Sequence, residues 1–166
     1  MPKSEQGVSS DRYQVIPRVL IFLIQDDKVL LLKGNPNKRI WANKYNGIGG
    51  HVEYGEDILS AARRELLEET GLSGIDLWLC GNIMVDASPE TGISIFLFRG
   101  EYHDGQIIDS EEGRCEWISA GQMQTLPMVE DLYTILPRVM AYHPGDALMY
   151  GHTFYNDQDQ MVIEFQ

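Results

Sequence analysis

The sequence predicts an α+β fold, or an α/β sandwich, from three observations. Short apolar runs bounded by turn residues recur along the chain, as expected of buried strands. Two other segments, 58–70 and 127–142, carry helix-forming residues or apolar residues at helical spacing. The chain has 166 residues, enough for one sizeable core. We therefore predict a single domain over residues 14–166, preceded by a polar and flexible N-terminus at 1–13.

The net charge restricts the partners of the chain. It is −12 at pH 7, and the sequence has no basic stripe that could release counterions from a nucleic-acid backbone. A nucleic-acid polymer is therefore not expected as a partner. A small phosphate compound is compatible with this charge if metal ions carry it in. Local cations would assist, such as Arg39 and Lys33, the latter as a substrate contact.

The cysteines and the apolar runs indicate the cellular compartment. Cys80 and Cys115 form no CxxC pair and are expected to be buried as small apolar side chains. Residues 1–10 lack the apolar core of a secretory signal. The longest apolar run, 19–24, is too short to span a bilayer. We expect a cytoplasmic protein without a membrane partner, either a monomer or a homodimer.

The first elements are predicted to be a hairpin of buried strands at 18–24 and 29–33. Segment 34–45 is rich in turn residues and is expected to be a loop anchored by Trp41. Segment 46–50 contains three glycines, so its backbone can approach another group closely.

The next element is a helix with signals at both ends. Residues 50–55 are too rich in glycine and polar side chains to be helical, whereas 58–70 consists mostly of strong helix formers. Asp57 can cap the free N–H groups of the first turn. Gly71 suits the left-handed conformation that ends many helices. We therefore predict a helix over 58–70.

Three glutamates of this helix share one face. At roughly 100° per residue, Glu65, Glu68 and Glu69 fall within an arc of about 100°. The neighbouring arc is apolar and is expected to face the core: Leu59, Ala62 and Leu66. Glutamates four residues apart repel on a plain surface helix, whereas hard divalent cations prefer oxygen ligands. The acidic face is therefore either a solvated surface relieved by Arg63 and Arg64, or a metal-binding edge.

The middle of the chain is predicted to contain three more strands. Segments 75–86 and 93–102 have the composition of strands, and 87–92 supplies the turn between them. The acidic segment 109–113 is expected to be a loop, followed by a short strand at 114–118.

The C-terminal part is predicted to contain a second helix and a last hairpin. Apolar residues at helical spacing predict a helix over 127–142, and Pro137 within it predicts a kink or a break. The final hairpin is expected from strands at 150–155 and 161–165, separated by a turn at 156–159.

Residues 50–72 match a complete sequence motif. The Nudix box has the pattern G-x5-E-x7-R-E-U-x-E-E-x-G-U, with U a bulky apolar residue. Every specified position is matched, by Gly50, Glu56, Arg64, Glu65, Leu66, Glu68, Glu69, Gly71 and Leu72. A full match of this length is a specific signal, unlike a lone GxGxxG. The chain resembles the Nudix hydrolase family, which implies a mixed β-sheet between helices (an α/β/α sandwich) with the box helix on one side.

The resemblance also implies a chemistry. The family cleaves nucleoside diphosphates linked to another group, by attack of water on a phosphorus of the pyrophosphate. It implies that Glu65 and Glu69 are the main ligands of Mg²⁺, with Mn²⁺ as an alternative cation. Glu68 would be a further ligand or would position water, and the backbone carbonyl of Gly50 would complete the site.

Two further contributions are implied by the resemblance. Arg64 lies on another side of the helix from Glu65 and would brace the loop acids, with Glu56 as its partner. An acid from outside the box usually binds metal or acts as a base. Glu111 and Glu112 are the candidates for it, and we prefer Glu112. Alternatively, Glu56 is an exposed loop residue and the acidic loop is a solvated turn.

Other stretches resemble one branch of the family, the 8-oxo-purine nucleoside triphosphatases: YNGIGGHVEYGED, EGRCEWI, LPMVEDL and YGHTFY. In that branch an Asn before the glycines and an acid pair after the LP segment contact the modified base. The matching residues are Asn46, Glu130 and Asp131, whose amide and carboxyl groups can read a purine edge. Two positions depart from the branch, because Tyr45 replaces a frequent Trp and Glu130 replaces an Asp. Both acids could equally favour a helix start.

The substrate that this resemblance favours is 8-oxo-dGTP, dGTP or a related purine nucleoside triphosphate, cleaved to the monophosphate and pyrophosphate. Two alternatives stay open. The box handles only the pyrophosphate, so ADP-ribose, a dinucleoside polyphosphate or a nucleotide sugar could be the substrate instead. A Nudix domain that senses a nucleotide without hydrolysing it is the second alternative, although all three helix glutamates are present.

Overall fold

The sheet is organised around its first strand, β1 (Gln14–Gln25), which lies between β2 (Lys28–Gly34) and β5 (Thr91–Glu101). The structure is a computed structural model that describes residues 2–166. Its strands in chain order are β1 (Gln14–Gln25), β2 (Lys28–Gly34), β3 (Tyr45–Asn46), β4 (Leu77–Asp86), β5 (Thr91–Glu101), β6 (Gly113–Ser119), β7 (Met149–Tyr155) and β8 (Met161–Phe165). They are ordered β3-β2-β1-β5-β4-β7-β8, and β6 pairs with β2. The sheet is mixed, because β1–β5 and β4–β7 are parallel and the other pairs antiparallel.

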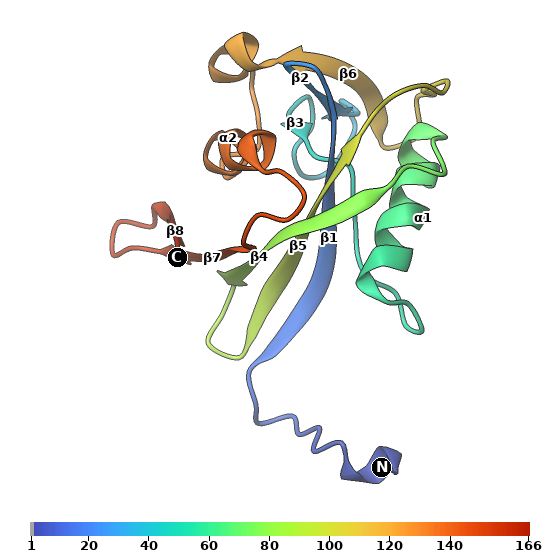
Figure 1. Cartoon of the computed structure of the whole chain (residues 1–166). Coiled ribbons are helices and arrows are strands. Elements are labelled where there is room, and N and C mark those ends of the chain that lie inside the picture. Colours follow the sequence, from blue (N-terminus) through green and yellow to red (C-terminus); the bar gives the residue numbers. More distant parts are fainter. Residues whose placement is uncertain (1) are drawn as a thin grey trace.

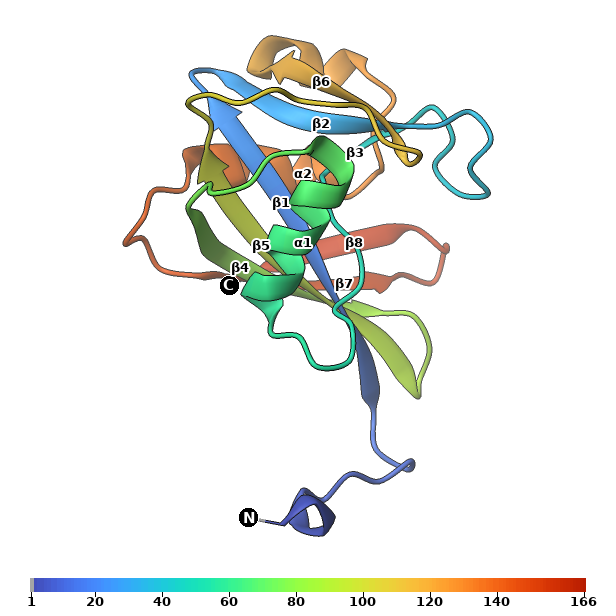
Figure 2. The same ribbon diagram turned by 90° about the vertical axis from the view of Figure 1, so that its right-hand side faces the viewer.

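Two helices cover opposite faces of this sheet, as Figures 1 and 2 show: α1 (Ile58–Thr70) and α2 (Leu132–Ala141). Two short 3₁₀ helices complete the fold, η1 (Lys3–Glu5) and η2 (Ala120–Thr125). Because strand side chains alternate, β1 contributes to both layers of core. On the α1 side pack Val19, Ile21, Leu23, Ala61, Ala62 and Leu66. On the α2 side pack Leu20, Phe22, Ile24, Leu132, Ile135 and Leu136. The predicted α+β fold, an α/β/α sandwich, is confirmed.

The ends of α1 follow the sequence signals. The helix spans Ile58–Thr70, as predicted. One carboxylate oxygen of Asp57 accepts hydrogen bonds from the N–H groups of Leu59 and Ser60, both at 2.9 Å. Gly71 ends the helix with φ of +75°, the left-handed region that glycine enters without strain. Local chemistry therefore fixes the helix that carries the glutamates.

Thr70 fastens the end of α1 to the segment that follows it. Its buried hydroxyl donates to the Leu66 carbonyl at 2.6 Å and accepts from the Leu72 N–H at 3.1 Å. Thr70→Val keeps the side-chain shape but leaves the buried Leu72 N–H without a partner. We expect the free energy of unfolding to fall by about 1–3 kcal/mol, measured by urea denaturation. Thr125→Val removes an exposed hydroxyl and is the control. An equal loss in both variants would contradict the role of Thr70.

The largest differences from the sequence-based boundaries lie at the starts of β1 and α2. β1 begins at Gln14 instead of residue 18, because its first residues pair in parallel with β5 from Thr91 onward. The second helix begins at Leu132 instead of residue 127. The preceding segment is extended, since the Tyr45 N–H donates to the Pro127 carbonyl at 2.9 Å. The helix then runs through Pro137 to Ala141, so no break occurs there.

The other predicted elements are present. Four antiparallel pairs lie at the expected places: β1–β2, β2–β6, β4–β5 and β7–β8. Cys80 is buried and Cys115 half-buried, both are free, and burial raises the pKa of each thiol to about 12. Within residues 2–166, no helix combines the length and the apolar character needed to cross a bilayer.

Candidate active site

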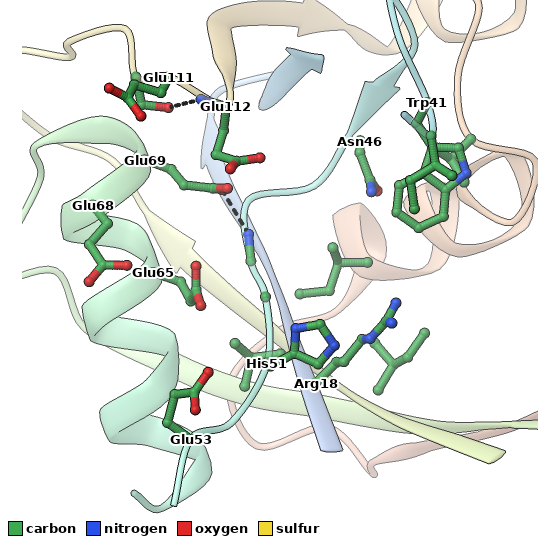
Figure 3. A pocket seen from close by; sticks show the side chains of 18 of the residues that line it. Arg18, Trp41, Asn46, His51, Glu53, Glu65, Glu68, Glu69, Glu111 and Glu112 are labelled. Carbon is green, nitrogen blue, oxygen red and sulfur yellow. Dashed lines mark hydrogen bonds between the residues drawn. The ribbon is translucent and has the colours of Figure 1, made fainter. Parts of the chain in front are cut away.

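A cavity of about 590 Å³ opens beside the glutamate face of α1. Most of the residues that the sequence singles out line it: Asn46, Gly50, Glu65, Glu68, Glu69, Glu112 and Asp131. Figure 3 shows the glutamates of α1 on one side of this cavity and Asn46 with Trp41 on the other. The cavity therefore has an acidic end and an end with amide and aromatic groups.

The glycine segment before α1 is pressed against both β1 and the helix glutamates. The Gly50 carbonyl accepts from the Val19 N–H at 2.9 Å. A Cβ added to Gly50 would lie 2.4 Å from Oε1 of Glu65. The Gly49 N–H donates to Oε2 of Glu69 at 3.0 Å. The segment therefore contacts the carboxylates of both Glu65 and Glu69, while the Gly50 carbonyl is hydrogen-bonded to β1.

Arg64 ties the helix to the loop that precedes it. Its Nε and Nη2 donate to the two oxygens of Glu56 at 2.7 and 3.0 Å, a bidentate pair. Nη1 donates to Glu65 at 2.8 Å and to Glu68 at 3.2 Å, and Nη2 also reaches the His51 carbonyl at 3.0 Å. Arg64 hydrogen-bonds to Glu65 without lining the cavity, and the pairing with Glu56 that the family resemblance implies is present.

Glu69 is the most buried acid of the cluster. It is 6% exposed, and burial raises the pKa of its carboxyl to about 7. The Gly49 hydrogen bond opposes this pKa shift, the charges of Glu65 and Glu112 add to it, and Lys38 counteracts them. The protein alone therefore supports the negative charge of Glu69 poorly. An added cation would stabilise the ionised form.

The acidic end fits a hard cation by the chemistry of its donors. All of them are oxygens, from carboxylates and one backbone carbonyl, as Mg²⁺ and similar ions prefer. No three His, Cys, Asp or Glu side chains in residues 2–166 are gathered closely enough to form a ready coordination set. Arg64 and the Gly49 N–H hold Glu65 and Glu69 in separate hydrogen bonds. The carboxylates face one space and would converge on a bound cation.

The two candidate acids of the loop between β5 and β6 point in different directions. Both Glu111 and Glu112 line the cavity. Figure 3 shows the Glu112 carboxylate directed toward Glu69, whereas Glu111 points away. Glu112 also forms an ion pair with Lys38. The geometry thus places Glu112 nearer the helix glutamates.

The other end of the cavity holds groups that could contact a nucleoside. Oδ1 of Asp131 is buried and has no hydrogen-bond partner within residues 2–166. Burial raises the pKa of the Asp131 carboxyl, and the charge of Glu130 adds to this shift. Trp41 has φ of +61°, a strained conformation for a non-glycine residue, and its side chain lines the cavity. Asn46 accepts from the Gly47 N–H at 2.8 Å, which leaves its amide nitrogen available.

Two residues predicted to bind substrate lie outside this cavity. Lys33 lines a separate hollow, and its Nζ lies 5.3 Å from the ring centre of Tyr45. Glu130 is exposed and does not line the cavity, unlike its neighbour Asp131. The structure therefore separates the predicted acid pair into one inward and one outward member.

Four polar residues of the cavity were not identified as site residues from the sequence: Arg18, His51, Glu53 and Ser110. His51 and Glu53 lie one and three residues after Gly50, at variable positions of the Nudix box. Arg18 is the only charged residue between positions 15 and 24 of an otherwise apolar strand. That isolated charge is the signal that could have identified it.

The domain is a mixed sheet between two helices with an acidic cavity beside α1, and comparison with known proteins gives its family. The model of the NUDIX domain matches residues 15–139. The chain belongs to the Nudix family and is a Nudix hydrolase. Nudix hydrolases act on small-molecule nucleotide substrates and generally use divalent metal ions.

Individual relatives agree with this assignment. Proteins named oxidized purine nucleoside triphosphate hydrolase are similar to this chain. The one from Danio rerio is 37% identical over 113 residues, covering 68% of this chain and 71% of that protein. The one from Mus musculus is 32% identical over 145 residues, covering 86% and 88%. Among solved structures, the mutator MutT protein from Bacillus halodurans has a TM-score of 0.75 at 25% identity, covering 91% of this chain and 97% of that one.

Proposed function

We propose that this Nudix hydrolase converts a purine nucleoside triphosphate to the monophosphate and pyrophosphate, with 8-oxo-dGTP, dGTP or a related purine triphosphate as substrate and Mg²⁺ as cofactor. Mn²⁺ is the alternative cation. The observation that carries the proposal is the unpartnered Oδ1 of Asp131, which lines the same cavity as the glutamates of α1. The names of the two relatives from Danio rerio and Mus musculus support the same substrate class.

The nucleoside end would select a purine through hydrogen bonds. An ionised Asp131 accepts hydrogen bonds, and a guanine base offers adjacent N–H donors on its N1 and N2. The amide nitrogen of Asn46, whose oxygen accepts from Gly47, can donate to an acceptor on the remaining edge of the base. Trp41 offers an aromatic face on which a base can stack. A buried acceptor without a partner costs free energy until a ligand satisfies it.

The acidic end would carry the chemistry on the phosphates. Glu65, Glu68, Glu69 and Glu112, with the Gly50 carbonyl, would hold Mg²⁺. A bound Mg²⁺ neutralises phosphate oxygens and lowers the pKa of a bound water. The protein residues orient the reactants: Arg64 fixes Glu65, and the Gly49 N–H fixes Glu69. Water attacks one phosphorus of the α–β anhydride, the P–O bond of that anhydride breaks to give the nucleoside monophosphate and pyrophosphate, and a carboxylate such as Glu112 accepts the proton from water.

A nucleotide panel tests this function. We expect Mg²⁺-dependent release of pyrophosphate from purine triphosphates, with a preference for 8-oxo-dGTP over the unmodified nucleotides. Turnover of ADP-ribose or a dinucleoside polyphosphate instead would keep the acidic end and reject the assignment of the base. Binding of nucleotides without any metal-dependent turnover would indicate the sensing alternative.

Asp131→Asn tests the base contact. The amide replaces one acceptor oxygen by a donor, so the match to a guanine edge is lost. We expect kcat/KM for the purine triphosphate to fall by about 10- to 100-fold, the range for a hydrogen bond to a charged group. Glu130→Gln is the matched control, because it removes the neighbouring charge at an exposed position outside the cavity. Similar losses in both variants would indicate a general charge effect.

The pH dependence of the same reaction gives a second test of Asp131. Its pKa is raised by burial, so it stays protonated to a higher pH than an ordinary aspartate. The acceptor form is lost as pH falls through this raised pKa, and 1/KM of the wild type should fall with it. The Asp131→Asn variant should lack that component, whereas Glu130→Gln should retain it. A wild-type profile that persists in Asp131→Asn would exclude Asp131 as its source.

A further inference from the structure

Arg18 is a lone guanidinium in an acidic cavity. Seven carboxylate residues line the cavity: Glu53, Glu65, Glu68, Glu69, Glu111, Glu112 and Asp131. Arg18 is the only Arg or Lys that lines it among residues 2–166. Its Nε is buried and has no hydrogen-bond partner within residues 2–166. A buried donor without a partner is costly, and a guanidinium would normally pair with a nearby carboxylate.

The register of β1 explains why Arg18 is kept apart from the glutamates. Arg18 forms a bridge with His51, and Ile21 forms one with Ile48. Arg18 therefore stands beside the residue that follows Gly50. Figure 3 shows Arg18 and Glu65 on opposite sides of His51. The guanidinium and the acidic cluster face the same space from different walls.

The same register places Arg18 along the path of an extended nucleotide. Arg18 and Leu20 lie on the same face of β1, about 7 Å apart at the usual rise of a strand. Gly47 packs closely on Leu20, so Leu20 marks the end of the cavity where Asn46 lies. A nucleotide whose base contacts Asn46 and Asp131 must extend its phosphates toward the acidic end. Its phosphates then pass between Arg18 and the glutamates.

We propose that Arg18 binds a phosphate oxygen of the substrate, from the wall of the cavity opposite the metal-binding glutamates. This proposal rests on the proposed nucleotide-hydrolase function. A guanidinium has a fixed fork of donors that matches phosphate oxygens, and it stays charged at any working pH. It offsets the repulsion that seven carboxylates exert on an anionic substrate. His51 flanks it with a ring that can donate one further hydrogen bond.

The side-chain Nε–H of Arg18 provides a direct test by NMR of the ¹⁵N-labelled protein in buffer with Mg²⁺. The Arg18→Gln variant assigns the signal by its absence. We expect addition of pyrophosphate or dGMP to shift this signal, and guanosine to leave it in place. No shift with either phosphate compound would overturn the proposal. A shift with guanosine equal to that with dGMP would also overturn it, because Arg18 would then contact the nucleoside.

Affinity and turnover measurements give the size of the effect. In Arg18→Gln we expect the Kd of dGMP and the KM of the triphosphate to rise on the order of 10- to 100-fold, with guanosine affinity unchanged. Arg18→Lys keeps the charge and loses the fork, so an intermediate value is expected. Arg12→Gln makes the same charge change outside the cavity and should match the wild type. Wild-type values for dGMP and the triphosphate in a folded Arg18→Gln would contradict the proposal.

Different results test the hydrolase function and the phosphate contact of Arg18. If the wild type hydrolyses no nucleotide but pyrophosphate still shifts the Arg18 signal, the proposed function is wrong and the phosphate contact of Arg18 stands. If the wild type hydrolyses purine triphosphates but the Arg18 signal does not respond to phosphates, the function stands and the contact is wrong. The NMR result decides the contact in either case.

Discussion

Glu69→Gln is expected to lose turnover by roughly two to three orders of magnitude, the size seen when one preorganised electrostatic group is removed from an active site. Glu69 is buried and faces both the Gly49 N–H and the acidic end of the cavity. The amide of Gln keeps the shape and can still accept from Gly49. It lacks the charge that would hold a divalent cation. The measurement is kcat at saturating substrate over a Mg²⁺ titration.

Stability measurements separate this loss from unfolding. Burial raises the folded-state pKa of Glu69 from 4.5 to about 7. Since a raised pKa means that ionisation destabilises the fold, the free energy of unfolding without metal should fall as pH rises from about 4.5 to about 7. Glu69→Gln removes this dependence and should be at least as stable as the wild type at neutral pH. Glu90→Gln, an exposed change of the same charge, is the activity control. Wild-type turnover in Glu69→Gln would contradict the metal assignment.

The parts of the fold that sequence could predict are those fixed by local chemistry. The helix α1 was placed correctly at both ends, because Asp57 and Gly71 act on backbone groups within one turn of themselves. The start of α2 was placed too early. Residues 127–129 have the apolar composition of the helix but pair with Tyr45, far away in the sequence. The spacing of apolar residues along the chain gives no information about this pairing with Tyr45. The start of α2 is therefore set by tertiary contacts.

In the site, too, local geometry was predictable from the sequence and long-range contacts were not. The face shared by Glu65, Glu68 and Glu69 follows from helix geometry, and the structure places all three on the cavity. Arg18 reaches the cavity only because of how β1 is aligned with segment 48–51. Sequence spacing alone does not give the alignment of two strands, so this residue was missed. Lys33 was expected near the substrate and lies at another hollow for the same reason.

The two adjacent glycines before the loop that leads into α1, Gly49 and Gly50, should respond to the same substitution in opposite ways. Gly49 has φ of +152°, and a Cβ there would lie 2.1 Å from the backbone carbonyl oxygen of Val19. That oxygen belongs to β1 inside the sheet and cannot move without displacing the strand. Gly49→Ala should therefore lower the free energy of unfolding by about 2–4 kcal/mol, as strained or overpacked substitutions do. Urea denaturation measures this loss.

Gly50→Ala should leave the fold nearly intact and damage the site. A Cβ at Gly50 would meet the end of the Glu65 side chain, with Oε1 at 2.4 Å, and that side chain can rotate away. Rotation moves the carboxylate out of the acidic cluster and out of its 2.8 Å bond with Arg64. We expect kcat to fall on the order of 10- to 100-fold, as for misplaced ligand-supporting groups, with near wild-type stability. Gly121→Ala, at a glycine with open space around it, is the control for both variants. Full activity in Gly50→Ala would mean that the close approach of Gly50 and Glu65 is not needed for catalysis, because the substitution abolishes that approach and spares the fold.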